Sequence, residues 1–438
     1  MLGSTARLFY GLAVYPPPAG KALTAEQAQQ LDDTFLSSDP FQYFRSRIAA
    51  LLSWHETAPV SAPVAPQASA PDIRAEFNSY LQRPAADGPF DVLDVHAQVA
   101  ADAFALRHHA AEALLRFIAA RLTPIEPGDG HCLWATVSKG SNQIGDVIAY
   151  VRDEAKLPDA AERWFELLVP PYARLADRDD PNVVEATNVF ISWIGFAIEL
   201  LTPADIDHHA ANNKIKHGLA VRSRSDMRVT FTAQPPNHDG SIPLEALTGE
   251  DALDIFDQPV LEVLAQGPKT NGHRQGLEIT QLRLQPSAML AQAFMLAMTQ
   301  AALFHVAAIE HIAQRDENAD QMAPPKFPGY PVGGPRPQDI DAAAPLGLRF
   351  PLTEPPGGGP VTRPAGIGFR DCFVPMRLDY ANRTTGVVVA DGASTAVSDR
   401  ARPSGNDPDL TRSVKNQERF MAHDNAAASR VGARAPQP

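Results

Sequence analysis

The residues best suited to chemistry lie in one short segment, Asn212-Asn213-Lys214-Ile215-Lys216-His217-Gly218. On a helix, residues three and four positions apart share a face, so we expect the His217 imidazole to lie above Asn213 and Lys214. An imidazole that titrates near neutral pH can accept and donate a proton, and an ammonium group can stabilise charge on a phosphate. The segment is therefore suited to metal-independent cleavage of RNA. In that reaction His217 is the acid and base, and Lys214 or Lys216 stabilises the phosphoryl charge.

This segment resembles the motif of the HEPN superfamily, all-helical proteins common in prokaryotic defence and toxin–antitoxin systems. In that family an arginine, usually followed by a polar residue, precedes a histidine by four to six positions, often with a glycine after it. Asn213, His217 and Gly218 fit the last three of these positions, whereas Asn212 stands where the arginine is expected. Asparagine is neutral and cannot clamp a phosphate as a guanidinium does. The resemblance covers about residues 91–221, and it implies a helical bundle that acts on RNA as a dimer.

Basic and polar residues around this motif are candidates for binding RNA or a nucleotide. The stretch that follows it is basic, and a long predicted helix carries a second polar cluster. The predicted nucleic-acid-binding residues are Asn212, Asn213, Arg222, Arg224, Arg107 and His108. Two other interpretations stay open. The motif can be a solvated helix end with Gly218 after its last turn, and the second cluster can be a row of ion pairs that includes Glu112 and Arg116.

Composition limits the functions that the chain can have. A net charge of −13 argues against wholesale binding to nucleic acid and leaves only local basic patches. Two cysteines, Cys132 and Cys372, fit a reducing compartment, so we expect a cytoplasmic protein. Adjacent histidines on a helix diverge, so His208, His209 and the nearby aspartates do not predict a metal site. We expect neither a metal nor a cofactor.

Hydrophobic periodicity predicts a mainly α protein, with a helical bundle, a small antiparallel β insertion and a Pro/Gly-rich C-terminal extension. The helix from 183 to 201 is apolar on nearly all sides, which is typical of a central helix. Alternating patterns predict that strands 227–232 and 276–284 pair with each other. The predicted helices span 24–36, 40–56, 72–81, 90–122, 142–155, 158–169, 183–201, 205–219 and 287–314.

The same patterns divide the chain into four predicted parts. These are an N-terminal strand or arm at 1–23, a HEPN-like bundle at 24–221, a β insertion with a long returning helix at 222–318, and a partly disordered tail at 319–438. No apolar run approaches the length of a membrane span, so we expect no membrane association. We also expect a homo-oligomer. The alternative function is a non-catalytic oligomerisation scaffold with an unknown partner.

Overall fold

The computed structural model of the chain describes sixteen stretches of residues. They are 22–55, 95–124, 131–138, 143–174, 180–203, 208–218, 221–224, 227–232, 238, 252–256, 259–267, 269, 274–314, 323–340, 347–358 and 384–389. Most of the predicted N-terminal strand or arm at 1–23, the predicted helix at 72–81 and much of the predicted tail at 319–438 lie outside these residues.

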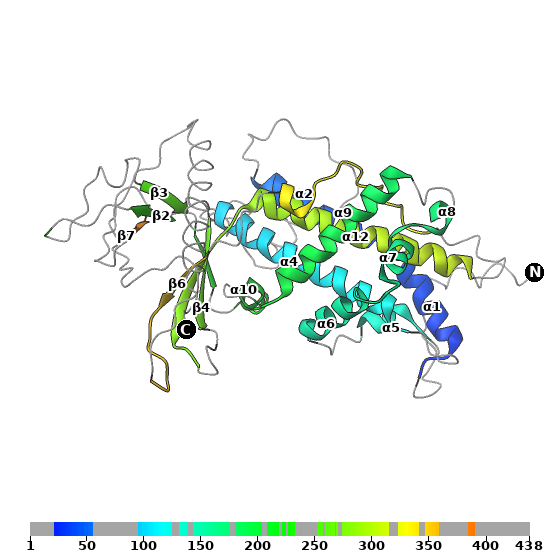
Figure 1. Cartoon of the computed structure of the whole chain (residues 1–438), viewed down its shortest axis with the longest axis horizontal. Coiled ribbons are helices and arrows are strands. Elements are labelled where there is room, and N and C mark those ends of the chain that lie inside the picture. Colours follow the sequence, from blue (N-terminus) through cyan, green and yellow to red (C-terminus); the bar gives the residue numbers. More distant parts are fainter. Residues whose placement is uncertain are drawn as a thin grey trace, which may run out of the picture. The chain divides into compact units, whose positions relative to one another are not determined.

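The described part of the chain is mainly helical, with a small β portion, which confirms the predicted fold class (Figure 1). The α-helices are α1 (Ala25–Leu36), α2 (Pro40–His55), α4 (Val95–Leu122), α5 (Leu133–Ser138), α6 (Ile144–Glu154), α7 (Ala160–Leu168), α8 (Pro171–Arg174), α9 (Pro181–Leu201), α10 (His208–Lys216) and α12 (Pro286–Ala313), and a 3₁₀ turn, η3, spans Pro337–Asp339. Helix α5 was not predicted.

Local signals explain where the helices begin. At α1 the Thr24 hydroxyl accepts from the Gln27 amide at 3.2 Å, and the Gln27 side chain accepts from the Thr24 amide at 3.0 Å. Thr24 and Gln27 thus form a capping box, in which each side chain satisfies a backbone amide at the start of the helix. Helix α9 begins with Pro181, and the carboxylate of the preceding Asp180 accepts a hydrogen bond from the Asn182 amide at 2.8 Å.

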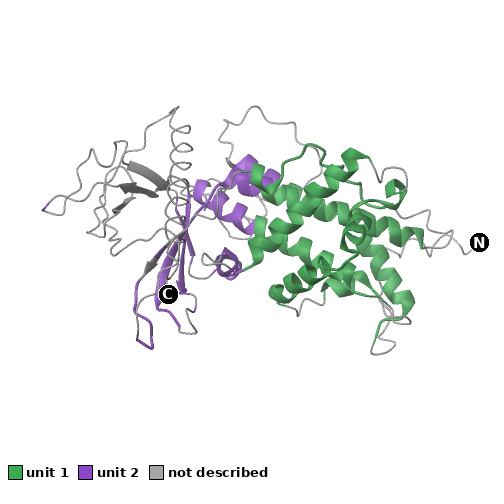
Figure 2. Cartoon of the chain, in the orientation of Figure 1, with its two compact units in different colours: residues 1–46, 107–202, 292–340 green, residues 47–106, 203–291, 341–438 purple. Residues whose placement is uncertain are grey.

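The chain forms two compact units, each assembled from separate stretches of sequence (Figure 2). Unit 1 contains residues 1–46, 107–202 and 292–340, and unit 2 contains residues 47–106, 203–291 and 341–438. In unit 1 the core joins α1, α4 and α12 through aromatic rings. The Phe304 ring lies 5.1 Å from that of Phe35 and 5.3 Å from that of Phe117.

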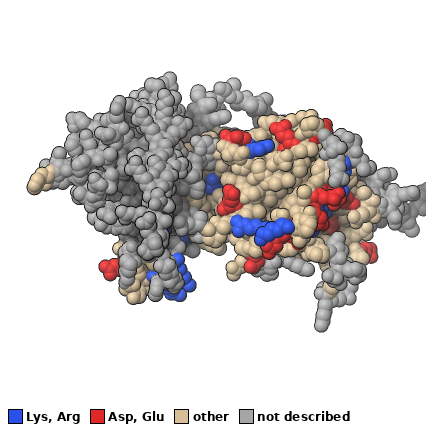
Figure 3. Space-filling view, in the orientation of Figure 1, with Lys and Arg blue, Asp and Glu red and all other residues tan. Residues whose placement is uncertain are grey.

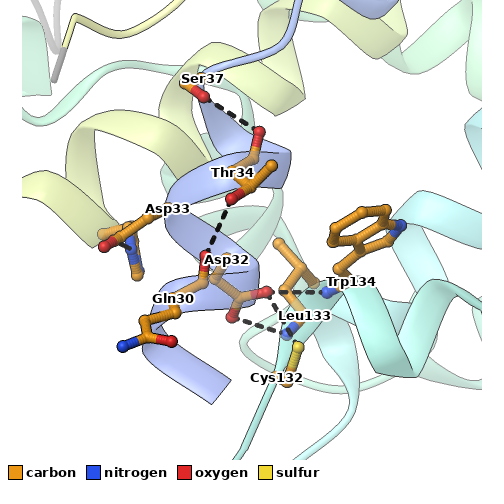
Figure 4. A network of polar contacts seen from close by, with 9 residues as sticks. Gln30, Asp32, Asp33, Thr34, Ser37, Cys132, Leu133 and Trp134 are labelled. Carbon is orange, nitrogen blue, oxygen red and sulfur yellow. Dashed lines mark hydrogen bonds and ion pairs between the residues drawn. The ribbon is translucent and has the colours of Figure 1, made fainter. Parts of the chain in front are cut away.

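A buried carboxylate fastens α5 to α1 within unit 1 (Figure 4). The Asp32 side chain, only 6% exposed, accepts from the backbone amides of Leu133 at 2.8 Å and Trp134 at 2.9 Å. The Cys132 thiol donates to the same carboxylate at 3.2 Å. Burial is the main reason that the pKa of Cys132 rises to about 11, so the thiol stays protonated at neutral pH. Asp32 thus satisfies the amides that begin α5.

Among the described helices, α9 and α12 are long and apolar enough to span a membrane, which the sequence analysis did not expect. In α12, 83% of the most apolar window is buried inside the protein, so α12 is a core helix. In α9 the buried share is 44%, and Val184 and Ile191 are 43% and 40% exposed. Helix α9 was predicted to be a central helix; one face of it is buried, and another exposes Val184 and Ile191. Figure 3, which has the orientation of Figure 1, shows a broad area of the unit 1 surface without charged side chains.

The strands form two sheets rather than one. An antiparallel sheet has the order β1-β4-β5-β6, and a second has the order β3-β2-β7, in which β2 pairs antiparallel with β3 and parallel with β7. The predicted pairing of 227–232 with 276–284 was therefore wrong, because β2 pairs with β3 and β7, whereas β5 pairs with β4 and β6. The strands are β1 (Val221–Arg224), β2 (Met227–Thr232), β3 (Ala252–Phe256), β4 (Val260–Gln266), β5 (Leu277–Arg283), β6 (Gly347–Pro351) and β7 (Thr384–Val389).

Candidate functional site

The predicted catalytic histidine lies at the end of α10, in unit 2. The His217 amide donates to the Asn213 carbonyl at 3.2 Å, and the Gly218 amide donates to the Ile215 carbonyl at 2.9 Å. Gly218 has a φ of +62°, the left-handed conformation in which glycine commonly ends a helix. The geometry matches the interpretation of a helix end. Lys214, Lys216 and His217 lie in its last turn, where cationic groups interact favourably with the helix dipole.

Exposure separates the motif into an inner and an outer side. His217 and Lys216 are exposed, and Lys214 is half-buried. Asn212 is only 1% exposed, and neither its amide nitrogen nor its amide oxygen has a hydrogen-bond partner among the described residues. The position at which the HEPN motif has its arginine therefore faces the interior. Asn212 was predicted to bind nucleic acid, but its side chain is buried and is not presented to solvent.

Asn213 is engaged within α10. Its side-chain nitrogen lies 3.1 Å from Nε2 of His209, one turn earlier on the helix. The amide nitrogen can only donate, so Asn213 uses its side-chain donor within the helix. His208 instead stacks on Phe104 of α4, with ring centroids 5.8 Å apart. In the described part of the chain, no three histidine, cysteine or acidic residues gather as metal ligands would.

The second predicted cluster is also interior. Arg107 is 4% exposed, His108 is fully buried, and Nη1 of Arg107 donates to Oε1 of Gln292 on α12 at 3.0 Å. Burial lowers the pKa of Arg107 to about 9. Both residues were predicted to bind nucleic acid, but their side chains are buried and are not presented to solvent. Glu112 and Arg116 form an ion pair at 3.0 Å, as the alternative interpretation expected.

Arg222 and Arg224 lie on β1, opposite a carboxylate that the sequence analysis missed. Glu262 of β4 lies 3.3 Å from Nη1 of Arg224 and 4.0 Å from Nη1 of Arg222. The Gln281 side chain donates to the same carboxylate at 3.1 Å. Arg224 has a side-chain exposure of 12% and is engaged, whereas Arg222 is 58% exposed at the longer distance and still meets solvent. A charge inside the apolar run Val260–Gln266 was the available signal for Glu262.

The described structure therefore brings together only part of the predicted site. Lys214, Lys216 and His217 end α10, and α10 contacts β1, which carries Arg222. No family model, curated protein or solved structure matches this chain.

Proposed function

We propose that the protein binds RNA through the α10–β1 segment, defined as residues 208–224, and does not cleave it. The observation that carries the proposal is the charge of this segment. It contains Lys214, Lys216, Arg222 and Arg224 and no aspartate or glutamate, in a chain whose net charge is −13. A local excess of positive charge on an acidic protein supports contact with a polyanion, because phosphate contacts supply most sequence-independent affinity.

The exposure of these side chains supports the same proposal. Lys216, His217 and Arg222 are exposed, and they lie on two elements that contact each other within unit 2. Arg222 is held by Glu262 only at 4.0 Å, so its guanidinium can exchange that carboxylate for a phosphate at little cost. The expected mode is salt-dependent binding to the backbone of single-stranded RNA, with little sequence preference.

Absence of cleavage follows from the position of Asn212. HEPN-type chemistry, as the resemblance implies it, needs a guanidinium beside the histidine, and here that position holds a buried neutral amide. The ribonuclease alternative has His217 as acid and base and Lys214 or Lys216 as the group that stabilises the phosphoryl charge. It requires an ammonium group to replace the bidentate phosphate contact of a guanidinium. We therefore propose a HEPN-like RNA-binding protein of a prokaryotic defence or stress system, located in the cytoplasm.

Fluorescence anisotropy with a labelled 20-nucleotide single-stranded RNA tests binding across a series of KCl concentrations. Each phosphate contact contributes about 0.7 to the salt slope of single-strand binding, so Lys214→Ala/Lys216→Ala should lower the slope by about 1.4. The matched control is Lys156→Ala/Lys269→Ala, which removes the same charge from two exposed positions outside the segment and should leave the slope unchanged. Equal slopes for the two double variants would refute the proposal.

The same RNA, analysed on a denaturing gel, tests the second part. It should remain intact with the wild-type protein. Cleavage by the wild type that His217→Ala abolishes would replace the binding proposal with the ribonuclease alternative.

The scaffold alternative is favoured by one observation, the apolar outer face of α9 that exposes Val184 and Ile191. Light scattering after size-exclusion chromatography would test it. A homo-oligomer that Ile191→Lys dissociates, together with no affinity for RNA, would support a scaffold in place of an RNA-binding protein.

A further inference from the structure

A proline-rich segment of unit 1 is held by hydrogen bonds from buried side chains of two helices. Residues 323–340, called the strap below, contain six prolines in eighteen residues, Pro324, Pro325, Pro328, Pro331, Pro335 and Pro337. Apart from η3 the strap forms neither helix nor strand, and it belongs to the region for which the sequence predicted a tail (Figure 1). Glycines with φ of +97° at Gly329 and +65° at Gly333 turn its direction. Proline fixes φ near −65°, so such a chain is largely preorganised.

Two side chains of the helices hold carbonyl groups of the strap. Nε1 of Trp193 on α9 donates to the Pro335 carbonyl at 2.9 Å, and Nδ1 of His305 on α12 donates to the Pro325 carbonyl at 2.7 Å. Trp193 is fully buried, and His305 is 6% exposed. Because proline has no N–H, carbonyl groups are the main polar groups that a proline-rich chain offers a receptor. The two donors are therefore matched to this kind of chain.

Aromatic side chains of the strap fill apolar positions between these two bonds. Tyr330 packs against a buried cluster of Val169, Ala173 and Val183. The Phe327 ring lies 5.2 Å from that of His305. Aromatic rings supply much of the contact area in recognition, and both rings are half-buried against unit 1.

We infer that the helical surface beneath the strap is a recognition site for proline-rich peptides, which the chain fills with its own strap. The surface is formed by Trp193, His305 and the Val169–Ala173–Val183 cluster. It combines an indole N–H aimed at a carbonyl with an apolar receptor for an extended chain, as proline-rich recognition generally does. The ligand is a proline-rich peptide that carries aromatic residues between its prolines.

The strap then acts as an internal competitor. A tethered segment has an effective local concentration on the order of millimolar, so a free peptide of equal intrinsic affinity displaces it only at similar concentrations. A partner must therefore bind more tightly than the strap or act where the strap has been released. The bound strap thus regulates access of a partner peptide to the site, and this regulation does not depend on RNA binding in unit 2.

The test uses the full chain with residues 323–340 replaced by a Gly/Ser sequence of the same length. The probe is a fluorescein-labelled synthetic peptide with the sequence of residues 323–340, and its anisotropy is measured. Saturable binding in the micromolar range is expected, and the wild-type chain should need at least about tenfold more peptide because its own strap competes. A peptide with the six prolines changed to alanine should bind more weakly, since it loses the preorganised conformation.

A matched pair of tryptophan variants locates the binding. In the strap-replaced chain, Trp193→Phe removes one hydrogen bond and should weaken peptide binding about fivefold. Trp134→Phe is the control, because Trp134 packs on Phe35 in the α1–α5 region and should leave the affinity unchanged. Absence of saturable binding to a folded strap-replaced chain, or equal weakening by the two variants, would overturn the inference and leave the strap as a structural segment only.

A second measurement on the wild-type chain covers the case in which the replaced chain does not fold. The synthetic peptide then carries benzoylphenylalanine at the position of Phe327 and is used at about 1 mM, near the effective concentration of the strap. Photolysis should crosslink it to α12 around His305. Crosslinks spread over other elements, or none, would refute the site.

Discussion

Removing the Asp32 carboxylate should destabilise unit 1 strongly. Asp32 is 6% exposed and accepts from the amides of Leu133 and Trp134 and from the Cys132 thiol. In Asp32→Ala both amides lose their partner at the start of α5. An unsatisfied buried donor costs about 1–3 kcal/mol, so two of them predict a loss of about 4 kcal/mol in the free energy of unfolding.

Asp32→Asn separates charge from hydrogen bonding. The amide keeps one accepting oxygen but turns the second position into a donor that faces an N–H group. One amide therefore remains satisfied, and the predicted loss is about 2 kcal/mol, half of that for Asp32→Ala. The control is Asp153→Ala, which removes a carboxylate that is 73% exposed in an ion pair with Lys156 and should cost at most about 0.5 kcal/mol.

Equilibrium unfolding in urea, followed by tryptophan fluorescence, measures these differences. Trp134, Trp164 and Trp193 all belong to unit 1, and Trp134 stacks on Phe35 at 5.5 Å, so the signal reports this unit well. The midpoint should fall in the order Asp153→Ala, Asp32→Asn, Asp32→Ala while the denaturant slope stays constant. An Asp32→Ala variant within about 1 kcal/mol of the wild type would refute the reasoning, because water would then have to satisfy both amides.

Three further predictions concern single positions. Arg107→Met removes a buried charge and should lower the free energy of unfolding in urea by less than about 1 kcal/mol, whereas Gln292→Leu leaves that charge with one partner fewer and should lower it by about 2–3 kcal/mol. The reverse order would contradict the view that the buried Arg107 charge depends on Gln292. Gly218→Ala should lower the melting temperature by the equivalent of about 1 kcal/mol because the φ of Gly218 is +62°. Gly195→Ala inside α9 also has open space at the new Cβ and should raise the melting temperature, and equal shifts of the two variants would argue against a left-handed cap at Gly218. Glu262→Gln should tighten RNA binding at low salt by about twofold to fivefold, since it frees cationic side chains on β1, and unchanged anisotropy titrations would count against the α10–β1 segment.

Sequence reasoning located most helices because long periodic patterns and caps are local signals. Helix α12 (Pro286–Ala313) was predicted at 287–314, and helix α1 (Ala25–Leu36) was predicted at 24–36. Helix α5 was missed because its amides are satisfied by Asp32, about a hundred positions away in sequence. The sheet partners failed for a related reason, since alternation identifies a strand but not the strand beside it.

Only part of the candidate site was predicted from the sequence, because residue spacing does not show which face of a helix is buried. Spacing placed Lys214, Lys216 and His217 together, and they do share the end of α10. It did not indicate which side of α10 faces the core. Spacing likewise could not show that Arg107 is buried, because an Arg-His pair in a long helix reads the same on an exposed and on an interior face.

The burial of Asn212 bears directly on chemistry at His217. Five positions separate the two residues, and at 100° per residue they lie roughly 140° apart around the helix. Asn212 and Ala211 form the buried side of α10, so His217 lies on the solvent side for the same geometric reason. A guanidinium at position 212 would thus be directed into the core and away from an RNA held at His217. In this helix position 212 is buried and position 217 is exposed, so the proposal of binding without cleavage depends on the burial of position 212 as well as on its residue type.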